Sequence, residues 1–172
     1  LFTADVSQAF LRGLTFEQAA QMQGEVQREV QFTLPPGCSQ LLQHLPGFED
    51  YDPITEVLEM LRCGFGLKDA PRLWQKVLHG VLLDEGFVSL QADQQLYALY
   101  EGRVLQLIAS SHVDDLKGAG TSAAKQRLLA CLEKAFGGLK LQERNFECVG
   151  VMHETSADGS VWTHQHHYVS QL

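Results

Sequence analysis

The fold of this chain is decided by residues 104–118, VLQLIASSHVDDLKG. An apolar strand begins at Val104 and ends at two adjacent carboxylates, Asp114 and Asp115, after which a second run begins at Leu116. The carboxylates therefore occupy the tip of a tight hairpin. Like charges side by side repel, so the pair is stable when water solvates it or a cation neutralises it. Because Asp is also a common turn residue, a solvated loop tip is the alternative to a cation site.

The sequence on either side of this hairpin predicts an α+β fold. Residues 96–100 and 104–109 flank a Glu-Gly-Arg turn and form a further hairpin, and amphipathic helices are expected over 70–85 and 122–136. The other expected elements are a strand at 1–10, a capped helix at 16–26, an extended stretch at 29–34, a loop at 38–55, an ambiguous element at 57–61, and strands at 146–151 and 160–163. An antiparallel sheet with helices packed on one face is the simplest arrangement of these elements.

The first predicted strand supplies a third carboxylate. Phe2, Ala4 and Val6 alternate with Asp5, so Asp5 lies on the face opposite to the apolar one. If this strand neighbours the hairpin, three carboxylates converge at the sheet surface. Hard oxygen ligands select Mg²⁺ or Mn²⁺, and two such ions about 4 Å apart support phosphoryl transfer. The residues therefore predict nucleotidyl transfer.

Composition limits the class of protein. The chain has 172 residues, 45% of them hydrophobic, which is typical of one globular domain, and it shows neither a membrane span nor a secretory signal. Four scattered cysteines predict reduced thiols in an intracellular protein. The 13 Lys+Arg and 21 Asp+Glu residues give a net charge of −8, which argues against a freestanding nucleic-acid binder. Because the chain begins with Leu and its last residues start an apolar segment, we expect a fragment of a longer protein.

Five motifs in register resemble the reverse transcriptases of copia-type LTR retrotransposons. They are FTADVSQAFLRG at 2–13, EVQFTLPPG at 29–37, GFGLKDAPRLW at 64–74, VDD at 113–115, and CVGV at 148–151 followed by QHHYV at 165–169. The resemblance covers essentially the whole chain. It implies that residues 1–172 form a single polymerase palm domain, truncated at both ends and lacking most of the fingers and the thumb.

The resemblance also implies roles for individual residues. Asp5, Asp114 and Asp115 would be catalytic and would hold two Mg²⁺ or Mn²⁺ ions, with the main-chain carbonyl of Val6 as a further ligand. Phe10 matches the bulky residue that excludes a ribose 2′-hydroxyl, although a core position is its alternative. The remaining nucleotide-binding residues would be Phe65, Gly66, Lys68, Ala70, Pro71 and Arg72, with a solvated charge as the alternative for Arg72.

Three departures from the family pattern are visible. His112 stands where Tyr is usual and would contact the primer end, Phe65 replaces a common Tyr, and residues 14–27 form a longer connection than usual. The template would be RNA or DNA with a primer, and the substrates would be deoxynucleoside triphosphates. The rest of the polyprotein would supply fingers, thumb, RNase H and integrase. The protein would be located in cytoplasmic virus-like particles, with the nucleus as a second location, and would not bind a membrane.

Several other interpretations stay open at the level of sequence. The chain could be a catalytically dead or domesticated fragment that acts as a binding or assembly module, or a palm that serves another reaction, as in nucleotide cyclases. Lys140 and Arg144 are candidates for a cation near the pyrophosphate leaving group. A zinc site is conceivable among four C-terminal histidines: His153, His164, His166 and His167.

Overall fold

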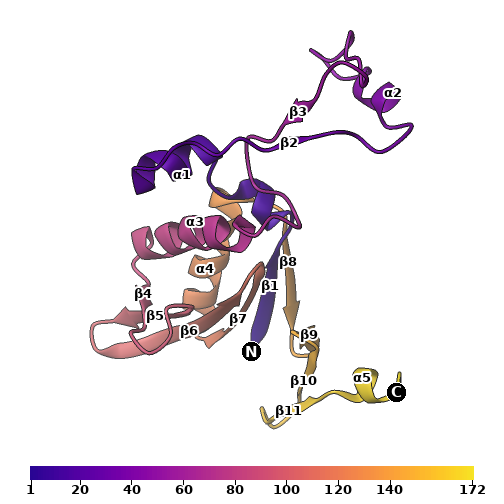
Figure 1. Cartoon of the computed structure of the whole chain (residues 1–172). Coiled ribbons are helices and arrows are strands. Elements are labelled where there is room, and N and C mark those ends of the chain that lie inside the picture. The colour runs from indigo at the N-terminus through magenta and orange to yellow at the C-terminus, as the bar shows by residue number, and fades with distance from the viewer.

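The computed structural model describes all 172 residues, and its main body is a six-stranded antiparallel sheet (Figure 1). The order of the strands is β4-β5-β6-β7-β1-β8, so the N-terminal strand lies between two strands from the second half of the chain. The strands are β1 (Phe2–Val6), β4 (Val88–Ser89), β5 (Leu96–Glu101), β6 (Val104–His112), β7 (Asp115–Gly120) and β8 (Leu139–Glu143). The main body therefore combines helices with an antiparallel sheet.

Two helices cover one face of the sheet. They are α3 (Ala70–Asp84) and α4 (Ser122–Ala135), whose boundaries lie within one residue of those expected from their apolar periodicity. Trp74 and Leu78 of α3 and Leu128 of α4 are completely buried, and they share one core cluster with Phe2 of β1. The apolar residues of β1 therefore point toward the helices, and Asp5 belongs to the opposite face.

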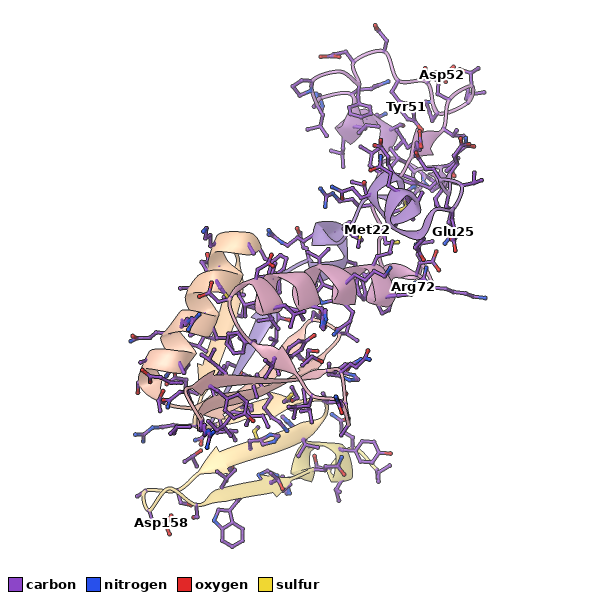
Figure 2. The ribbon with its side chains drawn as sticks, turned by 90° about the vertical axis from the view of Figure 1, so that its left-hand side faces the viewer. Met22, Glu25, Tyr51, Asp52, Arg72 and Asp158 are labelled. Atoms are coloured by element: carbon purple, nitrogen blue, oxygen red, sulfur yellow. The ribbon has the colours of Figure 1, made fainter.

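An arm extends from this body between α1 (Phe16–Gln23) and α3. After the 3₁₀ helix η1 (Ala9–Arg12), the chain forms α1, whose expected capping box is confirmed by reciprocal hydrogen bonds between Thr15 and Gln18. The outer part consists of α2 (Ser39–Leu42) and the paired strands β2 (Gln31–Phe32) and β3 (Leu58–Glu59). In Figure 2, Tyr51 and Asp52 lie in this outer part, far from the sheet.

The C-terminal segment forms a separate three-stranded sheet of β9 (Phe146–Cys148), β10 (Val151–Thr155) and β11 (Val161–His164), followed by α5 (His166–Val169). The single strand expected at 146–151 is wrong, because Val149 and Gly150 both have positive φ and form a two-residue turn. The hairpin expected around residues 157–159 is confirmed as β10 and β11. His164 ends β11, whereas His166 and His167 belong to α5.

Two further differences concern strands. The strand expected at residues 1–10 ends at Val6, and β8 and β4 were not expected.

None of the helices combines the length and the apolar character that crossing a bilayer requires.

Candidate active site

A row of polar side chains crosses four neighbouring strands on the face that the helices leave open. In the register of the sheet, His112 of β6 lies opposite Asp115 of β7, Asp115 lies opposite Asp5 of β1, and Asp5 lies opposite Lys140 of β8. Residues directly opposite one another on adjacent strands present their side chains on the same face. The structure thus places the strand that carries Asp5 beside the Asp-Asp hairpin, as the sequence analysis required.

The turn that carries Asp114 is held from two sides. Only Val113 and Asp114 join β6 to β7, and Val113 adopts a left-handed conformation with a φ of 56°, which is costly for a β-branched residue. The indole Nε1 of Trp74 donates a hydrogen bond to the Val113 carbonyl (2.6 Å), and the Val6 amide donates one to the Asp114 carbonyl (3.2 Å). The core helix α3 and the strand β1 therefore fix the backbone position of Asp114.

The three carboxylates lack a sufficient positive partner. Asp5 Oδ1 is a buried atom without a hydrogen-bond partner, although the side chain as a whole is 34% exposed. Its nearest cation, Lys140 Nζ, lies 3.7 Å away, which is within range of an ion pair but too far for a hydrogen bond. The pKa of Asp115 is raised, mainly by burial and then by the charges of Asp114 and Asp5, while His112 acts in the opposite direction. The site therefore carries excess negative charge.

A divalent cation would relieve the unfavourable electrostatics of these carboxylates. No three His, Cys, Asp or Glu side chains in the chain stand close enough together to form a complete metal-binding group. However, a buried carboxylate oxygen without a partner is unfavourable in free energy, and a cation relieves both this cost and the repulsion around Asp115. The donor set of Asp5, Asp114 and Asp115 consists of carboxylate oxygens, which Mg²⁺ and Mn²⁺ prefer. Val6 follows Asp5 at the end of β1.

Two of the predicted nucleotide-binding residues meet near the end of β1. The rings of Phe10 and Phe65 contact each other edge to face, with centroids 4.9 Å apart. Phe65 is 71% exposed, whereas Phe10 is partly buried and packs against both core clusters, so it serves the core as well as this surface. Gly66 follows with a φ of 89°, a conformation that favours glycine. Lys68 and Pro71 are exposed.

The structure gives other roles to Ala70 and Arg72. Ala70 is 1% exposed and packs in a cluster between α1 and α3, so it lines no open surface. Arg72 is exposed, and its Nη2 donates a hydrogen bond to Gln23 Oε1 of α1 (2.7 Å), which connects the long 14–27 segment to α3. Figure 2 shows Arg72 near Met22 and Glu25, at the side of the arm.

The remaining candidates are also separated by the fold. Lys140 is next to Asp5, but Arg144 follows the other end of β8, where Glu143 pairs with Phe2. Of the C-terminal histidines, His164 lies 3.4 Å from Glu154, whereas His153 is buried and turned toward the main sheet.

Sequence reasoning missed three residues of this region: Trp74, Lys117 and His153. A cavity of about 410 Å³ lies beside the row of polar side chains, and His112, Asp115, Lys117, Cys148 and His153 contribute to its wall. Strand alternation from Asp115 could have placed Lys117 on the same face. Nothing in the sequence indicated that His153 would reach it, because the two residues are 36 positions apart.

Comparison with known proteins relates the chain to retrotransposon polyproteins. It is 33% identical over 112 residues to the retrovirus-related Pol polyprotein from transposon RE2 of Arabidopsis thaliana, a match that covers 65% of this chain and 6% of the relative. It is 37% identical over 71 residues to the corresponding polyprotein from transposon RE1 of the same plant, covering 41% of this chain and 5% of the relative. No family model matches, and no solved structure matches. The chain spans a small part of these relatives, and its sequence supports an origin in a retrotransposon Pol polyprotein.

Proposed function

We propose that this chain is the palm portion of an RNA-directed DNA polymerase from a copia-type retrotransposon Pol polyprotein. The observation that carries the proposal is the direct register of Asp5 and Asp115 on adjacent strands, with Asp114 in the turn that precedes Asp115 and with Asp5 Oδ1 buried without a hydrogen-bond partner. The similarity to two Pol polyproteins supports the same origin. The reaction would add deoxynucleotides to the 3′-hydroxyl of a primer on an RNA or DNA template.

Asp5, Asp114 and Asp115, with the Val6 carbonyl, are the residues that would hold two Mg²⁺ or Mn²⁺ ions. When bound, such ions activate the attacking hydroxyl and stabilise the leaving pyrophosphate. Trp74 fixes the backbone of the turn and thereby the position of Asp114. His112 lies opposite Asp115 at the edge of the site, where it would contact the primer end.

The paired rings of Phe10 and Phe65 would line the sugar of the incoming nucleotide. Because Phe10 packs on the core, its ring has little freedom to move away from a 2′-hydroxyl. The exposed Lys68 would face the phosphates of the nucleotide. These assignments predict selection of deoxynucleotides over ribonucleotides.

A binding or assembly module without catalysis is the second candidate. The exposed apolar side chains of the arm favour it, since Val26 is 94%, Ile54 91% and Leu61 71% exposed. Such surface is typical of a contact with another protein segment. In a polyprotein, the remaining polymerase segments would be the partners under either candidate.

Primer extension separates the two candidates. The protein is expressed with the coding sequence that flanks this chain on both sides, and incorporation of dTTP on a poly(rA)/oligo(dT) substrate is measured with Mg²⁺ or Mn²⁺. We expect Asp114→Asn to abolish incorporation. Asp158→Asn is the matched control, because Asp158 lies at the tip of the β10–β11 turn, remote from the carboxylate row (Figure 2).

One further variant tests the nucleotide site. Phe10→Ala is expected to raise incorporation of ribonucleotides relative to deoxynucleotides. A folded protein that binds primer and template but incorporates nothing, or an Asp114→Asn variant as active as the unaltered protein, would refute the polymerase proposal and leave the binding module.

A further inference from the structure

The cavity beside the carboxylates contains an ammonium group that the proposed chemistry does not use. Lys117 follows Asp115 by two residues on β7, so both side chains lie on the same face, roughly 7 Å apart along the strand. Lys117 and Asp115 both contribute to the wall of the 410 Å³ cavity. No carboxylate oxygen lies within the 4.0 Å ion-pair distance of Lys117 Nζ, whereas Lys125 and Lys140 both have such partners.

The nearest partner of Lys117 is the buried imidazole of His153, which is 5% exposed. The His153 ring stacks on Phe146 with centroids 5.0 Å apart, and its Nδ1 lies 2.9 Å from the Val151 carbonyl. Since a carbonyl only accepts hydrogen bonds, Nδ1 must carry a proton. In the neutral ring Nε2 is then an acceptor, and it lies 3.4 Å from Lys117 Nζ.

This arrangement orients Lys117 without cancelling its charge. A neutral acceptor uses one of the three N–H groups of an ammonium, and two remain for another ligand. A carboxylate partner would also have neutralised the charge, as Glu143 does for Lys125. The chain carries a net charge of −8, which repels nucleic acid. A lysine held in a fixed position without a carboxylate partner offsets this repulsion locally and can bind a phosphate.

We propose that Lys117 binds the phosphodiester that joins the last two nucleotides of the primer, and that His153 is its positioning residue. The inference rests on the proposed function, in which the primer end would lie beside His112 and Asp115. The terminal phosphodiester is one nucleotide away from the 3′-hydroxyl of the primer. Lys117 is two residues away from Asp115 in β7, on the same face of the strand. A lysine ammonium is a suitable point charge for a phosphate.

The test measures primer–template binding by fluorescence anisotropy, with the protein that includes the flanking coding sequence. Two primers are compared: an ordinary one, and one whose last internucleotide linkage is an uncharged methylphosphonate. We expect the methylphosphonate to weaken binding by the unaltered protein about tenfold, as does Lys117→Met with the ordinary primer. In Lys117→Met, the methylphosphonate should not weaken primer binding any further. The slope of the logarithm of the binding constant against the logarithm of the salt concentration should decrease in magnitude by about one.

Three controls make the result specific. Lys125→Met removes the same charge from the helix-covered side and should retain full sensitivity to the methylphosphonate. Lys117→Arg keeps the positive charge and should retain most of the binding. If only the aliphatic part of the side chain mattered, Lys117→Met would bind as well as Lys117→Arg. A methylphosphonate five linkages from the primer end should weaken binding equally in the unaltered protein and in Lys117→Met.

The inference would be overturned if Lys117→Met remained as sensitive to the terminal methylphosphonate as the unaltered protein, or if the unaltered protein bound no primer. His153→Gln should weaken binding less than Lys117→Met while leaving the tenfold sensitivity partly in place, and an effect larger than that of Lys117→Met would contradict a positioning role. If primer extension depends on Asp114 but Lys117→Met does not change the effect of the methylphosphonate on binding, the role of Lys117 is refuted and the polymerase proposal stands. If Lys117→Met abolishes the effect of the methylphosphonate on binding but no nucleotide is incorporated, the polymerase proposal is refuted and the role of Lys117 in primer binding stands.

Discussion

Asp115→Asn is expected to stabilise the fold while it removes activity. Asp115 and Asp5 are directly opposite on adjacent strands, where side-chain Cβ atoms lie roughly 5 Å apart. Two negative charges at about 5 Å repel by about 3 kcal/mol at an effective dielectric constant near 20 and by about 0.8 kcal/mol in water. Because the Asp5 side chain is 34% exposed, solvent screening brings the expected gain in the free energy of unfolding to about 1 kcal/mol at neutral pH.

The pH dependence of this gain follows from the direction of the pKa shift. The pKa of Asp115 in the folded chain is raised above its ordinary value of 3.8. The folded state therefore holds the proton more tightly than the unfolded state, and the stability of the unaltered chain falls as the pH rises from about 3.8 through the folded pKa. The advantage of Asp115→Asn should be absent below this window and complete above it.

Urea unfolding at several pH values measures the effect, with and without Mg²⁺. Mg²⁺ should stabilise the unaltered chain and should do so much less in the variant, since one ligand is lost. Asp158→Asn is the opposite control, because hydrogen bonds from Ser160 lower the pKa of Asp158 and the substitution removes a favourable carboxylate. A variant Asp115→Asn that is less stable than the unaltered chain at neutral pH would refute the assignment of excess negative charge to this site.

Three further predictions concern the support of the site and the core. Trp74→Phe removes the donor to the Val113 carbonyl and part of a completely buried ring, so the free energy of unfolding should fall by about 1–3 kcal/mol. Because the turn loses its support, kcat for primer extension should fall while KM for the nucleotide stays, as measured by urea unfolding and steady-state kinetics. Arg12→Met removes hydrogen bonds to two backbone carbonyls, one of them just beyond the end of α4, and should lower the urea midpoint by an amount equivalent to about 1–3 kcal/mol. Burial raises the pKa of the Cys131 thiol to about 11, so iodoacetamide at pH 8 should leave it unmodified in the folded chain while the partly exposed Cys38 reacts, as mass spectrometry would show; modification of Cys131 at the rate of Cys38 would contradict its burial.

The elements that were predicted well are those with a local cause. The helix α3 buries Leu73, Trp74, Leu78 and Leu82 at helical spacing, and α1 begins at the capping box of Thr15. The β5–β6 hairpin has two apolar runs and a Gly turn between them. In each case the periodicity and the turn residue agree, and the tertiary structure changes neither.

The elements that were missed depend on distant partners. All five residues of β8 are at least partly exposed, and the strand forms because β1 offers a free edge beside it. The break at Val149 was hidden because valine rarely adopts a positive φ, so the run from Phe146 to Val151 resembles one strand. In the same way, the carboxylates could be identified from their position at strand ends, whereas Trp74 and His153 act through contacts with residues 39 and 36 positions away.

The departures from local rules gather around the same few atoms. Val113 has an unfavourable backbone conformation, Asp114 and Asp115 place two like charges in adjacent positions, and Asp5 Oδ1 is buried without a hydrogen-bond partner. A solvated loop tip explains only the adjacent charges, because an exposed turn requires neither a buried carboxylate oxygen without a hydrogen bond on the next strand nor a tryptophan that fixes a strained residue. Each feature costs stability by itself, and each is expected if the three carboxylates must stay in place for a ligand that the polypeptide does not supply. The proposed cation site gives that joint explanation, and the Mg²⁺ dependence of stability tests it, because a purely structural turn predicts no stabilisation by Mg²⁺ that Asp115→Asn removes.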